Sequence, residues 1–132
     1  MYTRIVVGAA ETEAAKLAIG DAVELANLTG AELHLVLAFD PYRDRIDPET
    51  APGTADAEAF LAGLAADATG AVHRHAVPGD PAEAIVGVAT DVDADLIVVG
   101  NKGMKGVGRV LGSVTNTVSH KAPCSVLIVS TT

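Results

Sequence analysis

The amino-acid sequence predicts an α/β fold: a single doubly wound domain over residues 1–132, built on an open, parallel, five-stranded sheet. Short runs of β-branched and aliphatic residues alternate along the chain with longer segments whose apolar residues recur at helical spacing. Strands that are separated by helical crossovers pair in parallel, and the helices cover both faces of the sheet. A length of 132 residues fits one such domain. We expect the strand order 3-2-1-4-5.

The first part of the chain contains two expected strands, one helix and a long loop. Residues 4–8 (RIVVG) form a short apolar run that ends at a glycine, which is typical of a buried strand. Thr12 can cap the helix that follows, and Gly30 stands where the C-cap of that helix is expected. Residues 33–39 form the second strand. Residues 40–54 are rich in proline and charge and have no periodicity, which predicts a loop.

The remainder of the chain alternates helices and strands. Asp80 is a suitable N-cap, and Pro81 occupies the first helical position, where its missing N–H costs little. Pro123 ends the last helix. The expected elements are helices over residues 55–68, 81–91 and 112–121, and strands over residues 71–77, 95–100 and 125–130.

The composition argues against several classes of protein. The single cysteine cannot form an intramolecular disulfide, so a cross-linked secreted scaffold is excluded. No apolar run approaches the roughly 18 residues of a membrane span, and the first ten residues lack a signal-peptide pattern. A formal net charge of -8 argues against general binding of nucleic acids. We therefore expect a cytoplasmic protein whose partner is neither a membrane nor a nucleic acid.

The charges are divided unevenly along the chain. Residues 1–95 contain seventeen acids and five bases, a net charge of −12, whereas residues 96–132 contain four bases and no acid, a net charge of +4. An acid-free segment inside an acidic protein is consistent with an anion site. The alternative explanation is chance, together with a strand that carries no charge.

The segment after residues 95–100 is the most informative part of the sequence. Residues 100–112 contain five glycines between an apolar strand and a helix, and such a loop can turn backbone N–H groups towards phosphate oxygens. The helix that follows adds an N-terminus, which favours anions. The segment is neither a P-loop nor a GxGxxG dinucleotide loop. Further polar groups for a phosphate chain are the hydroxyls of Ser113 and Thr115 and the cations Lys102, Lys105 and Arg109.

Gly100-x2-Gly103 and Gly112-Ser113 resemble the G-x2-G-x9-G-[ST] signature of the universal stress protein family, here with eight residues in the second interval. The similarity extends along the whole chain, through IVVG, GDPAEAI, ADLIVVGNKG and LGSVTNTVSHKAPCSVLIV. The resemblance implies a Rossmann-like fold of the adenine nucleotide alpha hydrolase-like kind. It also implies a small cytoplasmic homodimer that acts in stress response or signalling and binds ATP or AMP, with or without Mg²⁺.

By the same resemblance, the ribose and phosphates lie on the glycine loop and on the start of the last helix, and the backbone of Ala38 faces the adenine. The candidate nucleotide-binding residues are Ala9, Ala10, Thr12, Ala38, Gly100, Lys102, Gly103, Arg109, Gly112, Ser113, Val114 and Thr115.

One position departs from the family pattern. Nucleotide-binding members usually carry an aspartate after the first strand, in a G-T-D-x-S setting, that contacts the ribose; Ala10 stands in its place. Thr12 still matches the small hydroxyl residue, and Glu11 could supply a carboxylate from the next position. Two hypotheses therefore stay open: an adenine-nucleotide-binding protein, and an interaction module of the same family that binds no nucleotide.

Other reactive side chains form no recognisable catalytic or metal site in the sequence. His73 and His75 alternate on one expected strand, but no third metal ligand is apparent. Ser113 has no evident base, because His120 lies two turns further along the same helix. Cys124 is expected to be a buried, inert thiol. We expect no catalytic residue and no metal, and hence no enzyme, with slow ATP hydrolysis left open.

The last expected strand suggests how copies of the chain assemble. It is short and apolar, and the order 3-2-1-4-5 puts it at an edge of the sheet. An uncovered edge strand invites pairing with another chain, and antiparallel pairing of two copies gives a twofold dimer. We expect a homodimer through Ser125–Ser130, as the resemblance also implies.

Overall fold

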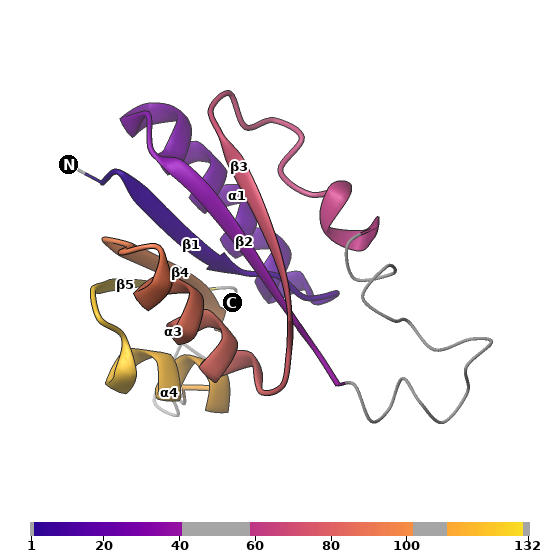
Figure 1. Ribbon diagram of the computed structural model, residues 1–132, viewed down its shortest axis with the longest axis vertical. Helices are drawn as coiled ribbons and strands as arrows, with labels where there is room; N and C mark the ends of the chain where they lie inside the picture. Colours follow the sequence, from indigo (N-terminus) through magenta and orange to yellow (C-terminus); the bar gives the residue numbers. More distant parts are fainter. Residues whose placement is uncertain (1, 41–58, 102–110, 131–132) are drawn as a thin grey trace.

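The computed structural model describes residues 2–40, 59–101 and 111–130, which form a parallel sheet with helices on both faces (Figure 1). The five strands lie in the order β3-β2-β1-β4-β5, so the predicted fold class and strand order are confirmed. The strands are β1 (Arg4–Gly8), β2 (Glu32–Phe39), β3 (Val72–Pro78), β4 (Leu96–Asn101) and β5 (Ser125–Ser130).

In the described parts of the chain, helices lie on both faces of the sheet, and Leu61 of the short helical segment 59–62 packs on the same face as the first long helix. Helix α1 (Glu13–Thr29) packs on the first face, whereas α3 (Pro81–Asp91) and α4 (Ser113–Lys121) lie together on the second (Figure 1). Successive strand residues alternate between the faces, so Val7 contributes to the α1 side and Val6 to the α3 side. Among the helices in the described parts of the chain, none is long and apolar enough to cross a membrane.

The central strand β1 is the most deeply buried part of the core. Ile5, Val6 and Val7 have no accessible surface, because helices cover both faces and β2 and β4 pair on both sides. Full burial of such side chains contributes roughly 1.5–3 kcal/mol each. The uninterrupted apolar run in the sequence is thus explained by a strand that touches solvent on neither face.

The helix caps are those that the sequence predicts. The N–H of Ala15 donates to Thr12 Oγ1 at 3.1 Å, and the N–H of Glu83 donates to Asp80 Oδ2 at 3.1 Å. At the end of α1, Gly30 is left-handed, with φ 75°, and its N–H donates to the carbonyl of Ala26 at 2.9 Å. The caps at Thr12 and Asp80 fix where α1 and α3 begin, and both of these helix starts lie at the carboxyl edge of the sheet.

The helix expected over residues 55–68 is shorter than predicted at its carboxyl end. Within the described residues it covers 59–62 and is followed by turns, with Ala65 in the left-handed region at φ 59°. Arg74 of β3 donates to the carbonyl of Leu61 at 2.8 Å and to that of Leu64 at 3.0 Å. The helix can therefore end before residue 68, because the guanidinium of Arg74 supplies hydrogen bonds to carbonyls at its carboxyl end. The expected loop at residues 40–54 lies outside the described residues, apart from Asp40.

Asp95 ties the amino ends of β1 and β4 together. Its carboxylate accepts hydrogen bonds from the N–H of Thr3 at 2.8 Å, the hydroxyl of Thr3 at 2.9 Å and the N–H of Arg4 at 3.2 Å. Burial opposes ionisation of Asp95, but these hydrogen bonds outweigh it and lower the pKa of the carboxyl. The anchor sets the register of the two strands whose opposite ends form the candidate site.

Candidate functional site

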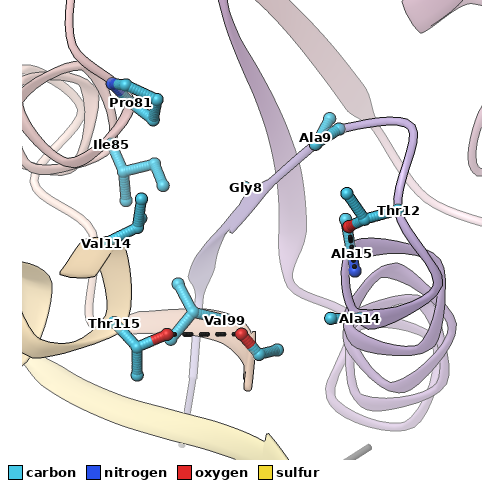
Figure 2. A pocket seen from close by; sticks show the side chains of 12 residues that line it. Gly8, Ala9, Thr12, Ala14, Ala15, Pro81, Ile85, Val99, Val114 and Thr115 are labelled. Carbon is cyan, nitrogen blue, oxygen red and sulfur yellow. Dashed lines mark hydrogen bonds between the residues drawn. The ribbon is translucent and has the colours of Figure 1, made fainter. Parts of the chain in front are cut away.

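A pocket of about 270 Å³ lies at the carboxyl ends of β1 and β4. The chain leaves β1 towards α1 on one face of the sheet and leaves β4 towards α4 on the other, which makes this the switch point where open α/β sheets bind ligands. In Figure 2, α1 forms one wall of the pocket, and Pro81, Ile85 and Val114 of the other face form the opposite wall. The lining residues are Gly8, Ala9, Ala10, Thr12, Ala14, Ala15, Pro81, Ile85, Val99, Gly100, Val114 and Thr115.

Three helices begin at this pocket, and their first turns differ in charge. Glu13 is acidic in the first turn of α1, and α3 has Asp80 as its N-cap and Glu83 in its first turn. Helix α4 has no acid in its first turn, and its N-cap, Gly112, makes no side-chain cap. Because unpaired N–H groups and the helix dipole favour anions, α4 is the helix of the three that best suits a phosphate.

Asn101, which the sequence analysis did not single out, organises the start of α4. Its side chain is buried, with 3% of the residue exposed, and its Oδ1 accepts the N–H of Gly112 at 2.7 Å. The N–H of Gly112 is therefore already engaged inside the protein. Its position as the polar residue that ends the apolar run of β4 is the signal that could have identified it.

Thr115 is also committed to the protein's own structure. Its hydroxyl donates to the carbonyl of Gly100 at 3.3 Å (Figure 2), and the residue is buried. The same oxygen can still accept a hydrogen bond, but it has no second proton to donate. The donors that the start of α4 offers to a ligand are consequently the backbone N–H groups of its first turn, among them those of Ser113 and Val114, and the hydroxyl of Ser113.

Gly100 has a packing role that the motif alone does not reveal. A Cβ at this position would lie 2.1 Å from the carbonyl oxygen of Ala14 and 2.6 Å from its carbonyl carbon. Both atoms belong to the backbone of α1, so no side chain can move aside. The glycine thus lets the first turn of α1 rest directly on β4, and this contact forms the floor of the pocket.

A second, open pocket of about 530 Å³ adjoins the first and shares Pro81 with it. It contains Ala38, the residue predicted to face adenine, at the carboxyl end of β2. Small-molecule sites typically occupy about 300–1,000 Å³; the first pocket alone falls just below that range and the second extends it. The lining residues are Ala38, Phe39, Asp40, Gly79, Asp80 and Pro81.

The predicted residues are thus brought together in part. Ala9, Ala10 and Thr12 line the first pocket beside α1, Gly100 lies at its floor, and Val114 and Thr115 line it on the α4 side. Glu11 is exposed and is not among the lining residues. Gly112 and Ser113 begin α4 next to Val114. Lys102, Gly103 and Arg109 lie outside the described residues.

Cys124 and His120 lie apart from the pocket. Burial raises the pKa of the Cys124 thiol, and the nearby Asp95 carboxylate raises it further, so the thiol is protonated at neutral pH and unreactive. His120 Nδ1 lies 2.8 Å from the carbonyl oxygen of Asn116 in its own helix. The imidazole thus makes a local contact one turn back along α4.

The sequence profile of the universal stress protein family matches residues 1–130. A universal stress protein of Mycobacterium tuberculosis is 33% identical, with 99% of this chain and 98% of that protein covered. One of Thermus aquaticus is 34% identical, with coverage of 98% and 99%. The crystal structure of a universal stress protein in complex with cAMP matches with a TM-score of 0.76 and 32% identity, over 99% of this chain and 98% of that one.

The contact between α1 and Gly100 makes a prediction about stability. We expect Gly100→Ala to lower the free energy of unfolding by about 3 kcal/mol or more, because the added methyl group meets backbone atoms. Gly20→Ala, which lies in α1 itself, is the matched control. A Cβ there meets nothing within 4 Å, and alanine should stabilise the helix by about 0.5–1 kcal/mol. Urea unfolding of both variants measures the difference; equal midpoints would contradict the assigned packing role.

Proposed function

The chain belongs to the universal stress protein family, and we propose that it binds an adenine nucleotide, ATP or AMP, at the carboxyl edge of its sheet. The observation that carries the proposal is the acid-free, side-chain-uncapped N-terminus of α4 at the switch-point pocket. The relative solved in complex with cAMP, 32% identical to this chain, supports the same class of ligand.

The charges at the pocket favour one orientation of the nucleotide. The phosphates would lie at α4, against the N–H groups of Ser113 and Val114, because the starts of α1 and α3 carry acids. The base would then occupy the second pocket, beside Ala38. In the family resemblance, the phosphates are also held by Gly103, with Lys102 and Arg109 neutralising their charge.

The ribose would lie on the β1 side of the pocket, beside Ala9, Ala10 and Thr12. The Thr12 hydroxyl oxygen accepts the N–H of Ala15, so its proton is available for a ribose oxygen. Ala10 offers no side-chain hydrogen bond. A hydrogen bond to a charged partner contributes about 1.5–3 kcal/mol, and the ribose would be held more weakly by this difference than by a protein with an aspartate at this position.

The proposed role is binding rather than catalysis, in stress response or signalling within the cytoplasm. Among the described lining residues of the first pocket there is no carboxylate, imidazole, thiol or amine, and hydrolysis of ATP needs a group that positions or activates water. Mg²⁺ at this pocket would be held by the phosphates and water. We therefore expect affinities for AMP to change little with Mg²⁺.

The competing hypothesis is an interaction module that binds no nucleotide, and the observation in its favour is Ala10 at the ribose side of the pocket. Isothermal titration calorimetry with AMP, ATP and cAMP separates the two hypotheses. Heats of binding to one site per chain support the nucleotide-binding protein. Absence of binding at millimolar nucleotide, with a folded protein, would establish the interaction module instead.

The N-terminus of α4 provides the sharpest test of where the phosphates lie. Ser113→Asp places a carboxylate beside the proposed phosphates, and we expect the affinity for AMP and ATP to fall about tenfold or more by charge repulsion. The same substitution should stabilise the protein by about 0.3–1 kcal/mol, because an acid at a helix N-terminus interacts favourably with the dipole. Binding and stability therefore change in opposite directions, which a loss of folding cannot imitate.

Ser119→Asp is the matched control. It adds the same charge to the exposed face of α4, six residues and about 9 Å further along the helix, and should leave the affinity unchanged within about twofold. Calorimetry and thermal unfolding are run on all three proteins. Equal nucleotide affinities for the wild type and Ser113→Asp would place the phosphates elsewhere.

Ala10→Asp tests the ribose side of the pocket. The new carboxylate should accept a ribose hydroxyl and tighten the binding of ATP and AMP by at most about 1–3 kcal/mol. The binding of cAMP, whose 3′-oxygen is esterified, should gain less. Calorimetry on the wild type and the variant measures the gain. Unchanged or weaker binding of ATP would argue against a ribose beside Ala10.

We also propose a homodimer formed through Ser125–Ser130. Strand β5 is an edge of the sheet, and the apolar side chains of Leu127 and, on α1, Leu28 are exposed nearby, around one shallow pocket. Light scattering should give twice the chain mass of 13.3 kDa. Leu127→Lys, which puts a charge on the edge strand, should give the monomer mass. A monomeric wild type at micromolar concentration would overturn the proposed assembly.

A further inference from the structure

Four ionisable side chains of β2 and β3 form a cluster, and none of them belongs to the glycine motif that begins at Gly100. Glu32 and His34 alternate on β2, His73 and His75 alternate on β3, and the register pairs His34 directly with His73. All four point to the face of the sheet that α3 covers, because Val36 and Val77 continue the same alternation into the core beneath α3. We refer to Glu32, His34, His73 and His75 as the histidine cluster.

Three members of the cluster converge on one small space. His34 Nε2 lies 3.4 Å from Glu32 Oε1, and His73 Nε2 lies 4.0 Å from the same oxygen. One ligand atom each from Glu32, His34 and His73 lies within 4.8 Å of the other two. The rings of His34 and His73 stack, with centroids 4.6 Å apart and planes 15° apart. Because imidazole lone pairs lie in the ring planes, the exposed His73 ring must turn for both Nε2 atoms to point at one ion.

His34 is oriented by the fourth member of the cluster. Its Nδ1 lies 2.9 Å from His75 Nε2, a hydrogen bond in which one ring donates and the other accepts. With Zn²⁺ bound, His34 Nδ1 is the donor to His75, and the Nε2 atom has its lone pair for the ion. Without the ion, Nε2–H can donate to Glu32 Oε1 at 3.4 Å, with Nδ1 accepting from His75. A hydrogen bond from the remaining ring nitrogen fixes the tautomer and the orientation of metal-bound histidines in the same way. His75 therefore holds His34 ready to act as a ligand.

Glu32 has a second partner besides the imidazoles of the cluster. Arg4 Nε lies 3.6 Å from Glu32 Oε1, so the carboxylate is shared between an arginine and two imidazoles. A carboxylate oxygen has lone pairs for both a metal ion and a guanidinium.

We propose that Glu32, His34 and His73 bind a divalent transition-metal ion, Zn²⁺ before others, with His75 as the positioning residue and water as the fourth ligand. Two imidazoles and one carboxylate, with one open position, are a ligand set that zinc accepts. Zn–N and Zn–O bonds of about 2.0–2.1 Å put tetrahedral ligands roughly 3.3–3.4 Å apart. Glu32 and His34 already meet this spacing. His73, half of whose side chain is exposed (49%), must move inward, because its Nε2 lies 4.0 Å from Glu32 Oε1.

No metal was expected from the sequence, because no third ligand is apparent there beside His73 and His75. The strand register supplies that ligand set, since it brings in two residues of β2 some forty positions earlier. The cluster lies near the amino ends of β2 and β3, whereas the candidate nucleotide pocket lies at the carboxyl ends of the strands. The ion would join the edge strand β3 to its single neighbour β2, and its binding is independent of the proposed nucleotide.

The test uses the full chain, untagged and freed of metal by chelation. Titration calorimetry with Zn²⁺ should give one ion per chain at micromolar protein, and the melting temperature should rise with added Zn²⁺. Co²⁺ in place of Zn²⁺ should give the visible absorption of a four-coordinate site. His73→Asn and Glu32→Gln, both at partly exposed positions, should weaken Zn²⁺ binding at least about 100-fold, and His75→Asn about 10–100-fold with the stoichiometry kept.

His120→Asn is the matched control, since it removes an exposed histidine outside the cluster, and it should bind Zn²⁺ as the wild type does. Circular dichroism shows that each variant is folded. Ser113→Asp, which acts on the nucleotide pocket, should leave Zn²⁺ binding unchanged, so the two proposals can fail separately. Absence of Zn²⁺ binding by the wild type, or binding that survives both His73→Asn and Glu32→Gln, would overturn the proposal.

Discussion

The contact between the first turn of α1 and β4 at Gly100 is the constraint on which the candidate site depends. With no side chain at Gly100, the backbone of Ala14 lies directly on the strand. That approach brings the Thr12 cap to the carboxyl edge of the sheet, beside Ala9 and Ala10. The carbonyl of the same glycine accepts the hydroxyl of Thr115, so one residue positions helices on both faces of the sheet. The first pocket lies between these helices.

The polar groups around the pocket are few, and most of them are already used by the fold. The side chain of Asn101 accepts a hydrogen bond from the N–H of Gly112, and that of Thr12 accepts one from the N–H of Ala15. The remaining backbone donors are concentrated at the start of α4, while acids occupy the starts of α1 and α3. An otherwise apolar cavity is therefore electrostatically asymmetric, although its described lining residues carry no formal charge. Backbone dipoles and caps, rather than ionised side chains, produce that asymmetry.

Much of the fold could be predicted because its determinants are local. Apolar runs marked the strands, and Thr12, Gly30 and Asp80 marked helix ends through hydrogen bonds to residues within four positions. What failed or was missed depends on contacts between distant segments. The helix expected to residue 68 ends early where Arg74 binds its carbonyls. The sequence pattern indicated Gly100 only as a glycine of a phosphate loop, whereas the close packing of α1 on β4 also requires a glycine there. The histidine cluster exists only in the register of β2 with β3, which no spacing along the chain reveals.

The central position of β1 has a consequence for how uniformly the pocket can deform. Amide protons of a strand buried on both faces and paired on both sides exchange with solvent only when the whole domain opens, whereas an edge strand such as β3 can open on its own at lower free energy. The first pocket rests on β1 and β4, and the second rests on the end of β2 and the turn after β3. One end of any molecule spanning both would meet a rigid wall and the other a compliant one. The second pocket would then accept ligand groups of different shape, whereas the first pocket would accept only groups that fit its rigid wall.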